Sequence, residues 1–128
     1  MNERSIDDLA DEWITAWARP EPPAIAAGEF GDAALDWDLP HDHPELCWNV
    51  ILNVLGRIDA EPSNRHFQAL AAGPLEDLLA NHGESFIERV ETRATQSAEF
   101  ALLLGGVWQS TIHPEVWARM RSCAKGPW

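Results

Sequence analysis

A chain of 128 residues leaves no room for a second domain of ordinary size, and its formal net charge of −12 argues against nucleic acid or anionic lipid as a partner. Hydrophobic residues make up 45% of the chain and include seven tryptophans, so the composition excludes global disorder and supplies one core. We therefore expect residues 1–128 to form a single domain.

The first predicted helix begins at Ser5, because Asp8 three residues later completes a capping box that satisfies exposed amides. Apolar residues then recur at steps of three and four and predict one buried stripe: Ile6, Leu9, Ala10, Trp13 and Trp17. The three prolines within residues 20–23 end this helix. We expect residues 20–43 to form a Pro-rich, acidic connector that contains a short helix within residues 32–39.

The next predicted helix has Pro44 at its first position, after Asp42 or His43 as N-cap. Its wide apolar face predicts the central helix of the domain and comprises Leu46, Cys47, Val50, Ile51, Val54, Leu55 and Ile58. Residues 20–56 contain seven acids and no Lys or Arg, so this region is expected to carry the negative potential of the protein.

Proline and glycine divide the C-terminal half into short predicted helices. A helix from Ser63 is expected to end at Gly73, since Pro74 disfavours helical geometry in the residue before it and opens the next helix. That helix is expected to end with Gly83 in a left-handed conformation, after which the chain re-enters a helix.

Two further helices complete the predicted fold. Ser97 caps a segment that the Gly105–Gly106 pair ends or distorts, and Pro114 begins the last helix with Trp117 and Met120 facing inward. No strand pattern is present, so the predicted class is all-α, either an irregular bundle or a short HEAT-like stack of about six to seven helices.

Several motifs in the chain resemble an uncharacterised bacterial domain-of-unknown-function family. They are Ala-Ala-Gly-Pro-Leu-Glu-Asp-Leu-Leu at residues 71–79, His82-Gly83, Phe86-Ile87, Gly-Gly-Val-Trp at residues 105–108, and Pro114-Glu115-Val116-Trp117. The likeness covers most of residues 44–121 and leaves residues 20–42 poorly matched. The resemblance implies a helical fold in bacteria and no established activity, and it transfers no catalytic or binding residue.

The acidic connector contains the first candidate site. Two imidazoles and nearby carboxylates suit zinc or nickel, and the residues concerned are Asp36, Asp38, His41, Asp42 and His43. A hydrated loop that runs into the N-cap before Pro44 is the simpler interpretation of the same residues.

Glu76 and Asp77 form a second candidate site for binding or acid–base chemistry, with His82 at the end of the same predicted helix. Both acids follow Pro74, where carboxylates neutralise the exposed amides of a first helical turn, so capping is the simpler interpretation.

Tryptophan is the third candidate feature. Five tryptophans fall on apolar stripes and are predicted to lie in the core: Trp13, Trp17, Trp48, Trp108 and Trp117. Trp37 and Trp128 lie outside any stripe, so we expect these two to be interface anchors.

These patterns favour a non-enzymatic interaction module that presents Trp37 and the acids of residues 29–45 to a basic protein surface, for example as an antitoxin-like or immunity-like inhibitor. The alternative is a small metal-dependent or hydrolytic enzyme that uses His41 and His43, or Glu76, Asp77 and His82. A pocket lined by converging polar groups would favour the enzyme, and exposed groups on a convex face would favour the module.

The N-terminal residues and the absence of known motifs bear on cellular location and cofactors. Residues 1–8 are charged where an export signal would be apolar, so we expect a cytoplasmic protein whose two cysteines, Cys47 and Cys123, stay reduced. No nucleophile elbow, phosphate-binding loop or zinc-helix motif is found, and no cofactor is expected.

Overall fold

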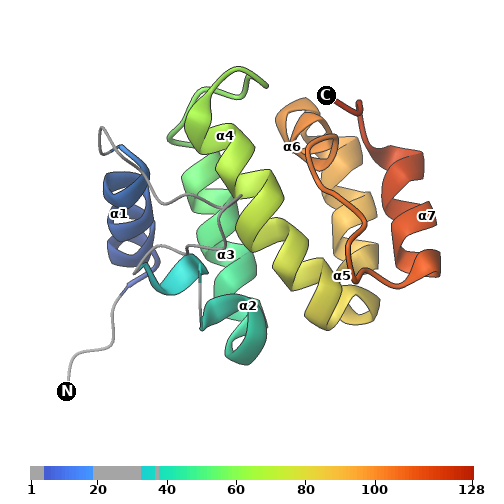
Figure 1. Ribbon diagram of the computed structural model, residues 1–128, viewed down its shortest axis with the longest axis horizontal. Coiled ribbons are helices and arrows are strands. Elements are labelled where there is room, and N and C mark those ends of the chain that lie inside the picture. Colours follow the sequence, from blue (N-terminus) through green and yellow to red (C-terminus); the bar gives the residue numbers. More distant parts are fainter. Residues whose placement is uncertain (1–4, 19–32, 37) are drawn as a thin grey trace.

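The computed structural model describes residues 5–18, 33–36 and 38–128, and every regular element in these ranges is helical, which confirms the all-α prediction. The elements are α1 (Ile6–Trp17), η2 (Ala34–Asp36), α2 (Leu39–Asp42), α3 (Pro44–Leu55), α4 (Arg65–Leu70), η3 (Ala71–Leu75), α5 (Glu76–Gln96), α6 (Ala98–Leu104) and α7 (Pro114–Cys123). They form an irregular helical bundle in which α1 and α7 lie at opposite ends of the long axis (Figure 1).

Helix α1 begins and packs as its sequence predicts. The Ser5 hydroxyl accepts a hydrogen bond from the amide of Asp8 at 3.1 Å, and the Ser5 amide donates to Asp8 Oδ2 at 3.3 Å, so the capping box is confirmed. The predicted stripe is buried at Leu9, Ala10, Trp13 and Trp17. This face packs mainly against α3, and the helix ends at Trp17 ahead of the prolines.

The short helix predicted within residues 32–39 is a 3₁₀ turn, η2, and the four-residue helix α2 follows it. Leu35 in η2 and Leu39 in α2 are buried, so this part of the acidic connector is fixed to the core through its apolar residues. The predictions for residues 19–32 and for Trp37 lie outside the described residues.

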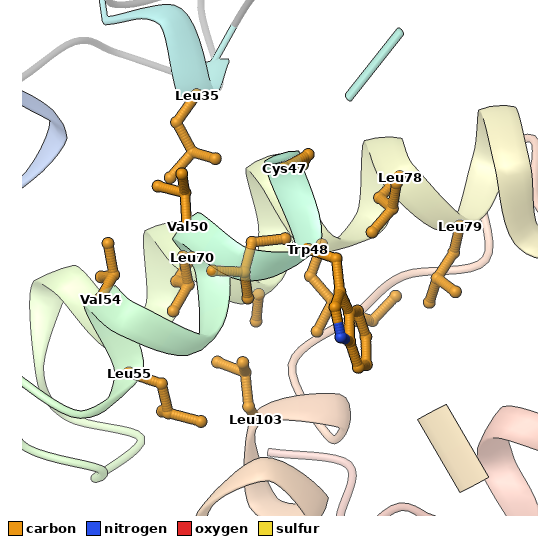
Figure 2. Close-up of a cluster of buried hydrophobic side chains, with 14 of the residues drawn as sticks. Leu35, Cys47, Trp48, Val50, Val54, Leu55, Leu70, Leu78, Leu79 and Leu103 are labelled. Carbon is orange, nitrogen blue, oxygen red and sulfur yellow. The ribbon is translucent and has the colours of Figure 1, made fainter. Parts of the chain in front are cut away.

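Helix α3 has the wide buried face that its sequence predicts, and its buried residues are Cys47, Trp48, Val50, Ile51, Val54 and Leu55. Figure 2 shows that Leu35, Leu70, Leu78 and Leu103 approach this face from η2, α4, α5 and α6. The Trp48 ring lies 5.8 Å from the Phe86 ring and 5.5 Å from the Phe100 ring, centroid to centroid, so aromatic contacts join α3 to α5 and α6.

The prediction that a helix ends at Gly73 is wrong. Helix α4 has Asn64, rather than Ser63, as its N-cap, and the helical backbone continues through the π-helical turn η3 into α5 with Pro74 inside it. A π turn accommodates this proline because the wider helical turn moves away the carbonyl with which a proline in an α-helix would clash. The N–H that proline lacks also falls where the α-helical hydrogen bonds are interrupted.

The predicted break near Gly83 is confirmed, but its cause differs from the prediction. His82 has the non-helical angles φ −136° and ψ 23°, and the chain changes direction there between the two halves of α5 (Figure 1). Gly83 does not have a positive φ. A Cβ at Gly83 would lie 2.8 Å from Val116 Cγ1, so the glycine is required for the close approach of α7.

Helices α6 and α7 begin and end close to the predicted residues. The Ser97 hydroxyl accepts from the Phe100 amide at 3.1 Å, and α6 ends at the Gly105–Gly106 pair. A Cβ at Gly106 would lie 2.4 Å from the Trp128 ring, so the pair also admits the C-terminal segment. In α7, Met120 is buried as predicted, whereas Trp117 is half-buried.

Neither cysteine of the chain is in a disulfide. Burial raises the pKa of the Cys47 thiol far above its ordinary value, so this group stays protonated at neutral pH. Among the described residues, no helix is both long enough and apolar enough to cross a membrane.

Candidate functional site

Asp36, predicted to belong to an exposed acidic site, points inward. Its carboxylate accepts hydrogen bonds from Trp13 Nε1 at 2.9 Å and from Trp17 Nε1 at 3.1 Å. Burial raises the pKa of Asp36, and the two indole donors partly offset that rise. The side chain therefore fastens η2 to α1, and it is not presented to a partner.

The other candidate residues of the connector are exposed around α2: Asp38, His41, Asp42 and His43. Within residues 5–18, 33–36 and 38–128, no group of three or more His, Cys, Asp or Glu side chains is arranged to hold a metal ion. We call Asp38 and Asp42 the acidic corner. The structure thus keeps these two acids at the surface and does not join them to His41 and His43 in a metal shell.

Glu76 joins two parts of the chain that are distant in sequence. Its Oε1 accepts a hydrogen bond from the amide of Trp108 at 3.0 Å, while its own amide donates to the carbonyl of Ala71 within the continuous helix. The capping interpretation is therefore wrong for Glu76, because the helix does not begin there. Burial raises the pKa of Glu76, with an opposing contribution from the Trp108 amide.

Asp77 and His82 face α2. Burial raises the pKa of Asp77 and the charge of His41 lowers it, and His82 Nε2 lies 2.7 Å from the carbonyl oxygen of His41. A cavity of about 260 Å³ at the kink of α5 is lined by His82 and His113, but by neither Glu76 nor Asp77. The second candidate set therefore does not form one site. Asp77 lies near α2, Glu76 bonds the loop at Trp108, and His82 lies at the kink of α5.

Trp108 is exposed, and the prediction that it lies in the core is wrong. The side chain is 73% exposed, the largest exposure of any large hydrophobic residue in the described part of the chain. The Gly105–Gly106 pair ends α6, so the helical periodicity that placed Trp108 on an apolar stripe no longer applies at that residue. Val107 is buried instead.

Trp108 forms one wall of an apolar depression of about 320 Å³, which we call the aromatic groove. The end of α6, the loop before α7, α7 itself and the C-terminal segment contribute to it through Gly105, Val107, Trp108, Gln109, Trp117, Arg121, Pro127 and Trp128. Three indoles from sequence positions up to 20 residues apart therefore meet at one surface.

The Trp128 wall is held from several sides. Its Nε1 donates a hydrogen bond to the Leu102 carbonyl at 2.6 Å, and its ring stacks on Phe67 with 5.3 Å between centroids. The main chain of Lys125 also donates to the Ala101 carbonyl. Trp128 as a whole is 36% exposed, so the residue predicted as an interface anchor is held in place and still reaches the surface.

The electrostatics of the groove differ from those of the protein as a whole. Among the described residues that line it, Arg121 has the only formally charged side chain, and its guanidinium lies 5.7 Å from the Trp117 ring centroid. Residues 100–128 contain three cationic side chains and one acid, Glu115. Arg119 is paired with Glu91 across α5 and α7, so Arg121 is the cation that faces the groove.

The chain belongs to DUF6869, a family of unknown function, whose model matches residues 29–127. This agrees with the resemblance drawn from the motifs and extends it into residues 29–42, which the motifs left poorly matched. No curated protein and no solved structure matches the chain.

Proposed function

We propose that this member of the DUF6869 family is a protein-interaction module that engages its partner through the aromatic groove. The observation that carries the proposal is the 73% exposure of Trp108 beside two further indoles. Tryptophan and arginine are the residues most enriched at binding hot spots, and a clustered apolar surface of this kind is typical of an interaction site.

The geometry around Trp108 supports a preformed site. Glu76 holds the backbone of Trp108, and Leu102 and Phe67 hold the Trp128 indole, so the Trp128 wall loses little conformational entropy when a partner binds. The acidic corner is a second contact in this proposal, for a basic patch of the partner, and its charge would raise the association rate more than the affinity. An antitoxin-like or immunity-like inhibitor is one form of such a module.

The enzyme alternative gains less support from the described residues. Its candidate groups do not line a common cavity, because the cavity at His82 excludes Glu76 and Asp77. The groove, in contrast, is mainly apolar and contains one charged side chain, which suits binding rather than acid–base chemistry.

A site-specific photo-cross-linking experiment tests the proposal. A cross-linking residue replaces Gln109, which lines the groove, or Asn49, an exposed residue of α3 used as the control position. We expect cross-linked partners from the native host at position 109 and not at position 49. Trp108→Ala should abolish the cross-linked species without changing the circular-dichroism spectrum, because Trp108 is exposed and is not part of the buried core.

Two results would contradict the proposal. Cross-linked species that persist at full yield in Trp108→Ala would show that the indole is not part of the contact. Identical species from positions 109 and 49 would show that the reaction reports random collisions and not docking in the groove.

A further inference from the structure

We infer that the aromatic groove takes a short acidic segment of the partner protein with one large apolar side chain, which enters between the indoles while a neighbouring carboxylate pairs with Arg121. This inference rests on the proposed function and specifies the chemistry of the partner. It depends on three features of the groove: its apolar walls, its one charged side chain and its distance from the acidic corner.

The apolar part of the inference follows from the walls. Val107, Pro127 and the three indoles leave a depression of about 320 Å³ in which an inserted aromatic or aliphatic side chain loses contact with water. The Trp128 wall is already ordered through Phe67 and Leu102, so an inserted side chain meets a fixed surface.

The acidic part follows from Arg121. Its guanidinium lies over the Trp117 ring, an arrangement that leaves the edge donors free for a carboxylate in a bidentate pair. Aromatic clusters also bind cations, but a cationic ligand here would meet the like charge of Arg121. Charge complementarity therefore selects an acidic segment.

The net charge of −12 opposes an acidic partner at long range, and its distribution limits that effect. Among the described acids of residues 20–56, Asp38, Asp42 and Glu45 lie at or next to α2, and Figure 1 shows α2 in the part of the bundle away from α7. Charges beyond about 8 Å are largely screened at physiological ionic strength, so Arg121 dominates within the groove. Two nearby acids are already engaged: Glu91 is paired with Arg119, and Glu76 accepts a hydrogen bond from the Trp108 amide.

Synthetic decapeptides are the probes that test the inference. Each has a Gly-Ser background and a central Phe flanked by two Glu, two Ser or two Lys, and a fourth peptide has the two Glu but Ser in place of Phe. The full chain is titrated with each peptide by calorimetry. We expect the Glu-Phe-Glu peptide to bind about tenfold more tightly than the Lys-Phe-Lys peptide. The peptide without Phe should show no measurable binding.

Three variants locate the effect. Arg121→Gln should remove the preference for Glu over Lys and keep the requirement for Phe, whereas Trp108→Ala should weaken binding of every Phe-containing peptide by at least about tenfold. Arg57→Gln removes a cation that is paired with Asp7 and Asp11 at the contact between α1 and α3, and it should leave all affinities unchanged.

A Lys-Phe-Lys peptide that binds as tightly as Glu-Phe-Glu, a preference that survives Arg121→Gln, or no binding of any peptide would overturn the inference. None of these results affects Trp108-dependent cross-linking at position 109, which tests the proposed function separately. Loss of cross-linking together with the expected peptide order would overturn the proposed function and leave the ligand chemistry of the groove intact.

Discussion

Asp36 attaches η2 to α1, together with Glu12, whose Oε1 accepts a hydrogen bond from the Ala34 amide at 2.8 Å. The Asp36 carboxylate accepts from two indole N–H groups, and one of them belongs to Trp13, which has no exposed surface. Removal of the carboxylate would leave both donors without a partner away from water. The charge is thus retained in a partly buried position because it satisfies two hydrogen-bond donors at once.

We predict that Asp36→Ala lowers the free energy of unfolding by about 2–4 kcal/mol, since each orphaned buried donor costs about 1–3 kcal/mol. Urea denaturation followed by tryptophan fluorescence measures the change. Asp38→Ala is the matched control, because Asp38 is exposed in the acidic corner, and its effect should stay within about 0.5 kcal/mol. Equal effects of the two substitutions would contradict the role assigned to Asp36.

Asp36 also predicts a pH dependence with a definite sign. Its folded pKa lies above the value of 3.8 expected for an unfolded aspartate, so the folded state holds the proton more tightly. The contribution of the group to stability is therefore present below pH 3.8 and is lost as the pH rises through the raised folded pKa. In Asp36→Asn this loss is absent.

The corresponding measurement is the difference in unfolding free energy between Asp36→Asn and the wild type from about pH 3 to pH 7. We expect the variant to gain stability relative to the wild type as the pH rises through this window. A constant difference would mean that Asp36 has the same pKa in both states. Glu45 and Glu91, whose pKa values are lowered by their arginine partners, contribute with the opposite sign and are unchanged in the comparison.

At the scale of the elements, capping side chains fix where helices begin, and the π turn η3 lets α4 continue into α5. Ser97 lies at the junction of α5 and α6, where its hydroxyl is the acceptor for the Phe100 amide. Pro74 is the opposite case. Proline normally ends a helix at the residue before it, but here a wider π turn accommodates Pro74 and the helix continues.

We predict that Ser97→Ala destabilises the protein by about 1 kcal/mol, the usual cost of a lost N-cap. Ser122→Ala is the control, since the Ser122 hydroxyl donates to the Ala118 carbonyl within an exposed turn of α7, and its effect should stay within about 0.5 kcal/mol. Thermal or urea denaturation provides the measurement. A larger effect at Ser122 than at Ser97 would argue against the capping role.

At the scale of the whole molecule, the C-terminal segment connects α4, α6 and the aromatic groove. Gly105 makes this possible, because a Cβ there would lie 2.2 Å from the Lys125 carbonyl oxygen and 2.8 Å from Trp128 Cδ1. The shape of the groove therefore depends on a glycine that precedes Trp128 by 23 residues.

We predict that Gly105→Ala displaces residues 124–128, lowers the unfolding free energy by about 1–3 kcal/mol and weakens binding of the Phe-containing peptides. Gly56→Ala is the matched control, since a Cβ there would be 3.6 Å from its nearest neighbour and φ is −72°, so its effect should be neutral or slightly stabilising. Peptide affinities and an unfolding free energy that stay unchanged in Gly105→Ala would contradict the prediction.

Local signals in the sequence were sufficient to predict most helices. The Ser5 and Ser97 caps, Pro44 and Pro114 as first helical residues and the apolar stripe of α3 depend on residues within a few positions of one another. Such patterns are set by helical periodicity and by the need to satisfy terminal amides, and both can be recognised without knowledge of the fold.

The candidate site depended on contacts that no local pattern contains. Asp36 meets Trp13 across 23 positions, and Glu76 meets the Trp108 amide across 32 positions. Trp108 resembles a core residue in sequence and is exposed because the chain leaves the helix just before it. The sequence by itself determined the helices and their buried faces, since these follow from short-range spacing. Only the tertiary structure decided which polar groups were buried and which indoles faced water, since both depend on segments far apart in the chain that pack together.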